Sequence, residues 1–202
     1  MTTVGVLALQ GNVVEHLHAL EESGARAVAV KTRADLESVD ALVIPGGEST
    51  TVMKLLQRFE LAGPIVERVR AGMPLWGTCM GLIVAAREVA GHPEQPTLGL
   101  LDVRVRRNAF GRQIASAQVG LQIPVLGRDP FPAVFIRAPW IEETGPGVEV
   151  LASLDGHGVL VREGHVLGSS FHPEMSPDRR VHEYFLSMVC DPVPVGKRST
   201  AA

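Results

Sequence analysis

The sequence is poor in aromatic residues, cysteine and long apolar runs. Aromatic side chains make up 4% of the 202 residues, so aliphatic residues must fill the core, as in parallel sheets covered by helices. Two cysteines, Cys79 and Cys190, are too few for a disulfide framework. Apolar stretches such as Leu82–Ala86 fall far short of the roughly 20 residues of a membrane span, and no signal peptide is evident at the start. These absences predict a soluble, reduced, cytoplasmic protein without a membrane partner.

An excess of charge of one sign is also absent. The chain has 19 basic and 22 acidic residues and a net charge of −3, without a basic stripe, which argues against binding to nucleic acid. The hydrophobic share of 46% and the charged share of 20% are ordinary for a globular protein. The length suits one domain, which we expect over residues 1–190, followed by a flexible tail at 191–202 that is rich in proline, glycine and basic residues.

Short β-branched runs alternate with amphipathic stretches in the first half of the chain. We expect strands at Thr3–Leu9, Arg26–Val30, Ala41–Ile44 and Pro74–Trp76. Helices are expected at Val13–Ser23, from a cap at Ser49/Thr50 through Leu61, at Pro64–Ala71 and at Leu82–Ala90. This alternation predicts an α/β domain whose central sheet is mainly parallel, with helices on both faces.

The second half of the chain has a different residue pattern, in which strand candidates predominate. Glycine and proline turns separate further strand candidates at Gly99–Arg106, Gln113–Gln122, Ala133–Ile136, Val148–Leu154, Val159–Arg162 and Val166–Phe171. Ser176 and Pro177 are typical of a helix start, so a final helix is expected to run to about Cys190. The later part of the sheet should therefore be mixed, within a single domain.

Cys79 is the first candidate for chemistry. Gly77-Thr78-Cys79-Met80-Gly81 has the form G-x-C-x-G between a strand and a helix, which is the nucleophile-elbow arrangement with a thiol. The glycines permit the sharp turn, and the helix N-terminus favours an anion on sulfur. The plain alternative is a small buried cysteine beside a turn.

A glycine-rich loop at Pro45–Thr50 resembles the elbow in its position between a strand and a helix. Its backbone N–H groups can face an anion at the carboxyl edge of a parallel sheet. Gly47 could then supply one N–H group to an oxyanion hole, with the N–H of Met80 as the other. Taken alone, the loop is equally compatible with an ordinary strand–helix turn.

His172-Pro173-Glu174 supplies a candidate base and its partner. In an extended chain, residues two apart share a side, and Pro173 restricts the backbone, so Glu174 can accept from one imidazole nitrogen while the other faces a nucleophile. His16 and His18 lie two apart on the first helix and are expected on a solvent or partner surface. No cysteine–histidine grouping has the spacing of a zinc site, so no metal is expected.

Together these residues resemble the glutaminase subunits of two-subunit pyridoxal phosphate synthases, a branch of the class I glutamine amidotransferases. The elbow and the His-Pro-Glu triplet are shared by class I amidotransferases, whereas the segments Pro45–Thr51 and Arg107–Gln113 are much more specific to this branch. The resemblance extends from about Val4 to Val189 and rests on Gly5–Gly11, Pro45–Thr51, Gly77–Gly81, Arg107–Gln113, Phe135–Pro139 and Phe171–Glu174.

The resemblance implies a flavodoxin-like architecture and specific roles for residues. Cys79 would be the nucleophile, His172 the general base and acid, and Glu174 its orienting partner, with Gly47 and Met80 forming the oxyanion hole. The implied substrate-binding residues are Gly46, Gly47, Glu48, Ser49, Arg107, Ile136 and Arg137. The sequence departs from the family's pattern at Met80, where alanine is frequent, and at Ala117, where an aromatic residue is usual.

The implied reaction is the hydrolysis of L-glutamine to L-glutamate and ammonia through a cysteine thioester. The ammonia would pass to a synthase subunit, within a large hetero-oligomeric complex, that makes pyridoxal 5'-phosphate from pentose and triose phosphates. The vitamer would be the product of the complex, so no cofactor is expected for this chain.

Two other functions remain open from the sequence. A different cysteine hydrolase on a related sheet would normally take its acid from a strand well before the histidine, whereas Glu174 follows His172. A non-catalytic regulatory subunit would not need the set of Cys79, His172 and Glu174.

Overall fold

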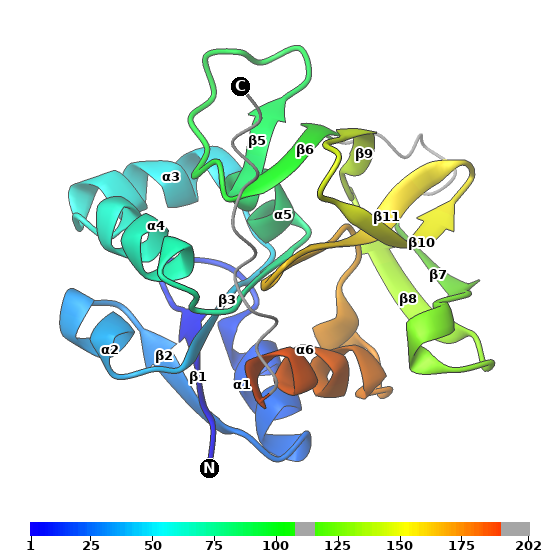
Figure 1. Ribbon diagram of the computed structural model, residues 1–202, viewed down its shortest axis with the longest axis horizontal. Helices are drawn as coiled ribbons and strands as arrows, with labels where there is room; N and C mark the ends of the chain where they lie inside the picture. The colour runs from blue at the N-terminus through cyan, green and yellow to red at the C-terminus, as the bar shows by residue number, and fades with distance from the viewer. Residues whose placement is uncertain (108–115, 191–202) are drawn as a thin grey trace, which may run out of the picture.

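Parallel strands form the centre of the structure, a computed structural model that describes residues 1–107 and 116–190 (Figure 1). Their order is β2-β1-β3-β4-β12, with β1 at Thr3–Leu7, β2 at Arg26–Val30, β3 at Ala41–Ile44, β4 at Leu75–Thr78 and β12 at Val166–Ser169. Every residue of β3, β4 and β12 is buried, as is typical of strands covered on both faces. This strand order is that of a flavodoxin-like doubly wound sheet, so the predicted architecture is confirmed.

The sheet continues beyond β12 through antiparallel pairs, which confirms its mixed character. β12 pairs with β11, β11 with β9, and β9 with β6, whereas β5 pairs with β6 in parallel and β10 pairs with β11 off this path. Strands β7 and β8 form a separate two-stranded sheet. The bounds are β5 Ala86–Val89, β6 Leu101–Arg106, β7 Ser116–Leu121, β8 Phe131–Ile136, β9 Trp140–Thr144, β10 Glu149–Leu154 and β11 His157–Glu163.

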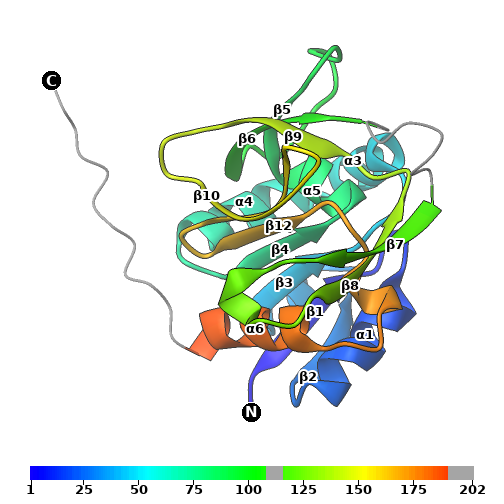
Figure 2. The ribbon, with the colours of Figure 1, turned by 90° about the vertical axis from the view of Figure 1, so that its right-hand side faces the viewer.

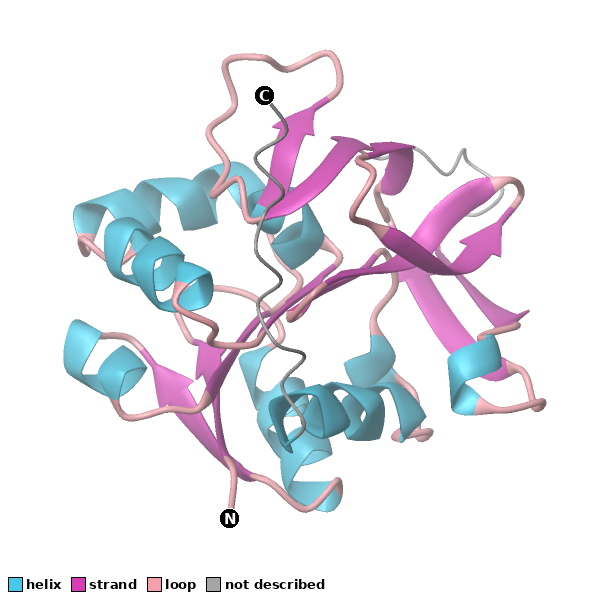
Figure 3. Cartoon of the chain, in the orientation of Figure 1, coloured by secondary structure: helices cyan, strands magenta, loops and turns pink. Residues whose placement is uncertain are grey.

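Helices cover both faces of the parallel strands (Figures 1 and 3). One face carries α2 Arg33–Glu37, α3 Ser49–Arg58, α4 Ala62–Arg70 and α5 Met80–Ala85, and the other carries α1 Val13–Glu22 and α6 Arg180–Cys190. The β7–β8 hairpin, its short 3-10 helix η2 (Pro124–Leu126) and α6 lie on the same side of the sheet (Figure 2). None of the helices within the described ranges has the length and apolar character needed to cross a membrane.

Alternation along the central strands divides the core into two clusters. In β3, Leu42 and Ile44 belong to the cluster beneath α3 and α5, whereas Val43 belongs to the cluster beneath α1 and α6. The second cluster holds the large rings of Trp76, Phe171 and Phe185 among others, all of them buried. The few aromatic residues are therefore concentrated on the side of the sheet that carries α1 and α6.

Several element boundaries differ from those predicted. The helix expected at Leu82–Ala90 ends at Ala85, because Ala86 turns to ψ 160° and residues 86–89 pair with β6. Helix α3 begins under a cap from Glu48 rather than from Ser49 or Thr50, and it ends at Arg58. The final helix begins at Arg180 rather than at Ser176 or Pro177, and the N–H of Arg180 donates to Asp178 Oδ1 at 3.0 Å; a 3-10 helix, η3, occupies Pro173–Met175. Strand pairing and side-chain capping decide these ends against local propensity.

Helix α2, strand β9 and the 3-10 helices η2 and η3 were not predicted, and parts of two predictions lie outside the described residues. Helix α2 starts with a capping box between Thr32 and Asp35, and β9 is paired along β6. The strand expected at Gln113–Gln122 is described only as β7, because residues 113–115 lie outside the described ranges, as does the predicted tail at 191–202. The remaining strands match their predicted ranges to within a few residues.

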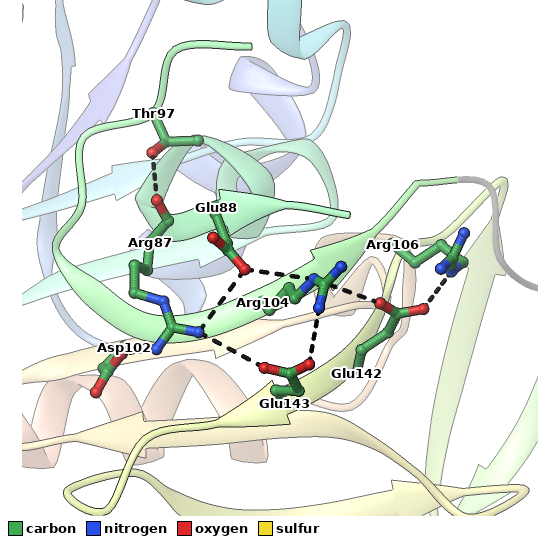
Figure 4. A network of polar contacts seen from close by, with 8 residues as sticks. All are labelled: Arg87, Glu88, Thr97, Asp102, Arg104, Arg106, Glu142 and Glu143. Atoms are coloured by element: carbon green, nitrogen blue, oxygen red, sulfur yellow. Dashed lines mark hydrogen bonds and ion pairs between the residues drawn. The ribbon is translucent and has the colours of Figure 1, made fainter. Parts of the chain in front are cut away.

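Charged side chains form a network on the exposed face of β5, β6 and β9 (Figure 4). Arg104 is its centre and contacts the carboxylates of Glu88, Glu142 and Glu143. Arg87 pairs with Asp102, Glu88 and Glu143, and Arg106 pairs with Glu142. Exposed pairs contribute at most about 1 kcal/mol each, and their role here is to fasten β9 and β5 to β6, the strand that leads to Arg107.

Candidate active site

The loops that follow β1, β3, β4 and β12 meet at the carboxyl edge of the sheet. Ile44 pairs with Gly77, and Thr78 pairs with Ser169, so these strands end side by side. A pocket of about 350 Å³ lies at this edge. In a flavodoxin-like sheet, this is the edge at which ligands bind. The pocket contains Cys79 and His172, which stand almost a hundred residues apart in the sequence.

Cys79 occupies a strained turn between β4 and α5. Its φ of 49° and ψ of −103° lie outside the regions that favour L-residues, and such a residue costs about 1–3 kcal/mol. The turn is closely packed, because a Cβ added at Gly81 would stand 1.9 Å from the carbonyl oxygen of Ile44. The N–H of Cys79 donates to the carbonyl of Ser169 at 2.7 Å, and its thiol donates to the carbonyl of Ile136 at 3.9 Å. The predicted elbow geometry is therefore present.

His172 lies between Cys79 and Glu174. Its Nδ1 is 2.8 Å from Glu174 Oε1, and it lines the same pocket as Cys79, whose side chain favours the charged form of the imidazole. Since Nδ1 faces the carboxylate, Nε2 is the nitrogen that remains for sulfur. The expected extended arrangement is wrong, because Pro173–Met175 is a turn of 3-10 helix. This turn folds the Glu174 carboxylate back onto the ring that precedes it.

Both members of this pair have strongly shifted pKa values. Burial opposes the charged form of His172, but hydrogen bonds and charge interactions with Cys79 and Glu174 outweigh it and raise the pKa to about 10. Burial likewise opposes the Glu174 carboxylate, but the nearby His16 and the hydrogen bond from His172 lower its pKa to about 2. At neutral pH, the pair is an imidazolium and a carboxylate. Because α5 has only six residues, its dipole is small, and the His172 imidazolium adds positive charge to the pocket that contains Cys79.

Two further residues hold the Glu174 carboxylate and were missed from the sequence. Asn12 Nδ2 donates to Glu174 Oε1 at 3.0 Å, although Asn12 stands at the N-cap of α1. His16 Nε2 is 3.3 Å from Glu174 Oε2, and the residue is fully buried, so its predicted place on the surface is wrong. His18 is exposed, as predicted. The helical spacing could have revealed the burial of His16, because His16 lies on the same face of α1 as Ala19 and Leu20, which are also buried.

The opposite side of the pocket is polar and charged. Arg107 Nη2 is 3.6 Å from Glu48 Oε1, and Arg107 Nη1 donates to Gln95 Oε1 at 2.8 Å. Gln95 Nε2 in turn donates to Ser49 Oγ at 3.0 Å. Burial opposes the charged form of Glu48, but hydrogen bonds from Thr50 and Thr51 lower its pKa to about 2. Gln95 lies in the loop between β5 and β6 and was not predicted, because nothing in that loop's sequence marks it.

The remaining predicted residues lie in or next to the pocket. Gly47, Met80, Ile136 and Arg137 line it, together with Gln10, whose Oε1 accepts from the N–H of Glu48 at 2.8 Å. Met80 is almost fully buried and also belongs to the core.

Gly46 does not line the pocket. It lies against the His172 ring, where an added Cβ would stand 2.4 Å from Cε1. Residues 108–113 of the predicted motif lie outside the described ranges. The described residues combine a thiol, an imidazole, a carboxylate and an arginine around a small pocket, a set that suits nucleophilic attack on a small polar substrate.

Comparisons with known proteins point to one family. Residues 6–191 match the SNO glutamine amidotransferase family. A protein of Acidothermus cellulolyticus named pyridoxal 5'-phosphate synthase subunit PdxT is 55% identical over 192 residues, which cover 92% of this chain and 93% of the relative. A relative of the same name from Herpetosiphon aurantiacus is 54% identical and is covered completely, against 92% of this chain. A crystal structure of a glutamine amidotransferase superposes with a TM-score of 0.88 at 49% identity, over 93% of this chain and 98% of that one.

Proposed function

This chain belongs to the SNO glutamine amidotransferase family, and from that membership we propose that it is the glutaminase subunit of a pyridoxal 5'-phosphate synthase. The resemblance seen in the sequence is thereby confirmed at the level of the family. The observation that most supports the activity is the position of the His172 ring, between the thiol of Cys79 and the carboxylate of Glu174 at the edge of the pocket.

The first half of the reaction forms a thioester. The sulfur of Cys79 attacks the side-chain carboxamide carbon of L-glutamine, and the N–H groups of Gly47 and Met80 stabilise the oxyanion that develops. Loss of one such donor costs about 3–4 kcal/mol in comparable enzymes. His172 then transfers its proton to the departing nitrogen, the C–N bond breaks and ammonia leaves. Glu174 keeps the ring in the orientation that this transfer requires.

The second half hydrolyses the thioester. His172, now neutral, takes a proton from a water molecule, whose oxygen attacks the same carbon. The C–S bond breaks, L-glutamate leaves, and the proton returns to restore Cys79 and His172 to their starting state. No metal or cofactor takes part in either half of this cycle.

The polar side of the pocket orients the amino-acid end of the substrate. Arg107 supplies the positive charge for the α-carboxylate, and Gly47, Glu48 and Ser49 line the site largely through their backbone, while Gly46 lies against the His172 ring. Ile136 and Arg137 complete the wall. Gln10 and Gln95 hold this wall in place through their bonds to Glu48, Arg107 and Ser49.

Ammonia is the product that the partner uses. In bulk water it is protonated and loses its nucleophilicity, so the chain docks on a synthase subunit, in a large hetero-oligomeric complex, that receives ammonia along a protected path. The synthase combines it with a pentose phosphate and a triose phosphate. Catalysis by a free Cys79 thiol needs reducing conditions, which supports the cytoplasm as the place of the reaction.

The deciding experiment compares two nitrogen sources in the complete complex. With the synthase subunit present, Cys79→Ser should abolish formation of pyridoxal 5'-phosphate from glutamine but leave formation from ammonium salts unchanged. Cys190→Ser is the matched control and should behave like the wild type with both sources, because Cys190 lies far along the chain at the exposed end of α6. Equal loss with glutamine and ammonium would contradict the proposed division of labour. A cysteine hydrolase of another kind would turn over esters and fail to release ammonia from glutamine.

A further inference from the structure

His16 lies behind the proposed catalytic residues rather than in the pocket. It projects from α1 toward η3 and is fully buried. Its Nε2 is 3.3 Å from Glu174 Oε2 and 3.1 Å from Thr78 Oγ1, the residue before Cys79. The imidazole thus stands between the strand that delivers the thiol and the turn that delivers the carboxylate.

The two oxygens of Glu174 have unequal surroundings. Oε1 is adjacent to His172 Nδ1 at 2.8 Å and accepts from Asn12 Nδ2 at 3.0 Å. Oε2 is buried, and among the described residues it has no hydrogen bond of full geometry, only a 3.3 Å contact with His16 Nε2. A buried carboxylate oxygen that lacks a donor is costly. The contact with His16 Nε2 therefore helps to stabilise the charged form of the Glu174 carboxylate.

The surroundings of His16 indicate which of its nitrogens carries the proton. Burial lowers the pKa of His16, helped by the positive charge of His172 and opposed by Glu174 and Glu15, so the ring is neutral at physiological pH. Within the described part of the chain, Nδ1 has no hydrogen-bond partner. An unpaired buried N–H is costlier than an unpaired lone pair, which places the proton on Nε2, the atom that faces Glu174 Oε2 and Thr78.

We propose that His16 is a positioning residue for the proposed glutaminase reaction: its neutral imidazole presents Nε2–H to Glu174 Oε2 and Thr78 Oγ1, and so fixes the carboxylate that orients His172. The inference rests on the proposed function. The effect of His16 on the orientation of His172 is greatest after acylation, because the sulfur of Cys79 is then bonded to carbon and no longer attracts the ring. At that stage the orientation of His172 depends on Glu174, which His16 contacts at Oε2 and Asn12 at Oε1.

A purely structural role is the competing explanation. The ring of His16 packs edge-on against Trp76 with centroids 5.7 Å apart and lies 5.6 Å from the ring of His182. His182 has the same burial and similar ring contacts, but its two nitrogens make no hydrogen bonds within the described residues. His182 therefore offers a matched control for the loss of a buried imidazole without loss of a contact to Glu174.

The test compares His16→Gln with His16→Met, two side chains of nearly the same shape. The glutamine amide can replace the donor at the position of Nε2, whereas methionine cannot. With the synthase present, we expect His16→Met to lower kcat for glutamine about 10- to 100-fold with little change in KM, since the lost contact involves a charged group. His16→Gln should stay within about threefold of the wild type, and His182→Met should keep the wild-type kcat for each folded molecule, whatever its Tm.

A second readout does not need glutamine. The rate at which iodoacetamide alkylates Cys79 in the isolated chain should fall in His16→Met, and the pH at which alkylation becomes fast should move upward, because a weaker Glu174–His172 pair attracts the sulfur anion less. If His16→Met does not fold, His16→Asn replaces it, since the shorter amide ends near the place of Nδ1.

The outcomes separate the two proposals. Equal kcat and equal alkylation profiles for His16→Met and His16→Gln would overturn the inference, as would an equal loss of kcat in His182→Met. Failure of the wild type to release ammonia from glutamine with its synthase would instead refute the proposed function, and the alkylation profiles would still decide the role of His16.

Discussion

Gln95 fixes the orientation of Arg107, a residue 12 positions later in the chain. The Gln95 Oε1 atom accepts a hydrogen bond from Arg107 Nη1 at 2.8 Å, and its Nε2 donates to Ser49 Oγ at 3.0 Å. Gln95 is nearly buried, whereas the guanidinium of Arg107 faces the pocket. One amide thus joins the loop after β5, the start of α3 and the end of β6 at the place where we expect the α-carboxylate of glutamine.

Replacement of Gln95 should weaken substrate binding more than chemistry. In Gln95→Met, Arg107 and Ser49 both lose a buried partner, and we expect KM for glutamine to rise about tenfold or more while kcat changes far less, since hydrogen bonds to charged groups are the stronger ones. Steady-state kinetics of ammonia release with the synthase present would measure both. Gln57→Met, at an exposed position on α3, is the control and should leave both constants unchanged. A fall in kcat with constant KM would contradict the role given to Arg107.

Gly46 is expected to tolerate no side chain, because the His172 ring occupies the space where a Cβ would lie. The added atom would stand 2.4 Å from Cε1, and real contacts of this kind do not occur. In Gly46→Ala, we therefore expect His172 to be displaced and kcat to fall about 100-fold or more, in line with the effect of small misplacements in other active sites. Gly63→Ala is a matched control on α4 with open space around its Cβ, and it should raise stability slightly, by at most about 1 kcal/mol. Wild-type activity in Gly46→Ala would contradict this prediction, because it would show that the His172 ring can move without loss of catalytic activity.

The sequence predicted the parts of the site that depend on chain connectivity. Parallel strands must end at a common edge, so the glycine loop after Ile44, the elbow at Cys79 and the segment at His172 could be placed together from the sequence, although the turn that His172 precedes was not predicted. The strands at Arg26–Val30 and Ala41–Ile44 were predicted with their observed bounds. The second is buried throughout and reads as a continuous apolar run, whereas the first lies at the edge of the sheet and is recognised by its β-branched valines.

The contacts missed from the sequence depend on tertiary packing. His16 was assigned to the surface from its distance to His18, although its phase with Ala19 and Leu20 faces the sheet. Gln95 lies in a loop whose course is set by the pairing of β5 with β6, and that pairing was hidden because residues 86–89 continue the helical pattern of α5. Residues that support a site through one long-range hydrogen bond leave no periodic signal, so a single sequence does not reveal them.

His182 should make the protein less stable in acid. Burial lowers the pKa of His182 to about 3, assisted by the nearby His16 and Arg179 and opposed by Glu174. In the unfolded chain, the same group titrates near its ordinary pKa of 6.5. Between these values the unfolded state binds a proton that the folded state does not, so the free energy of unfolding falls as the pH drops from 6.5 toward 3. His182→Met removes this acid-dependent loss of stability. Urea titrations at several pH values should therefore show that the free energy of unfolding of the variant depends less on pH in that range. His18→Met, at an exposed histidine, should keep the wild-type slope. An unchanged slope in His182→Met would mean that this ring is already protonated in the folded protein.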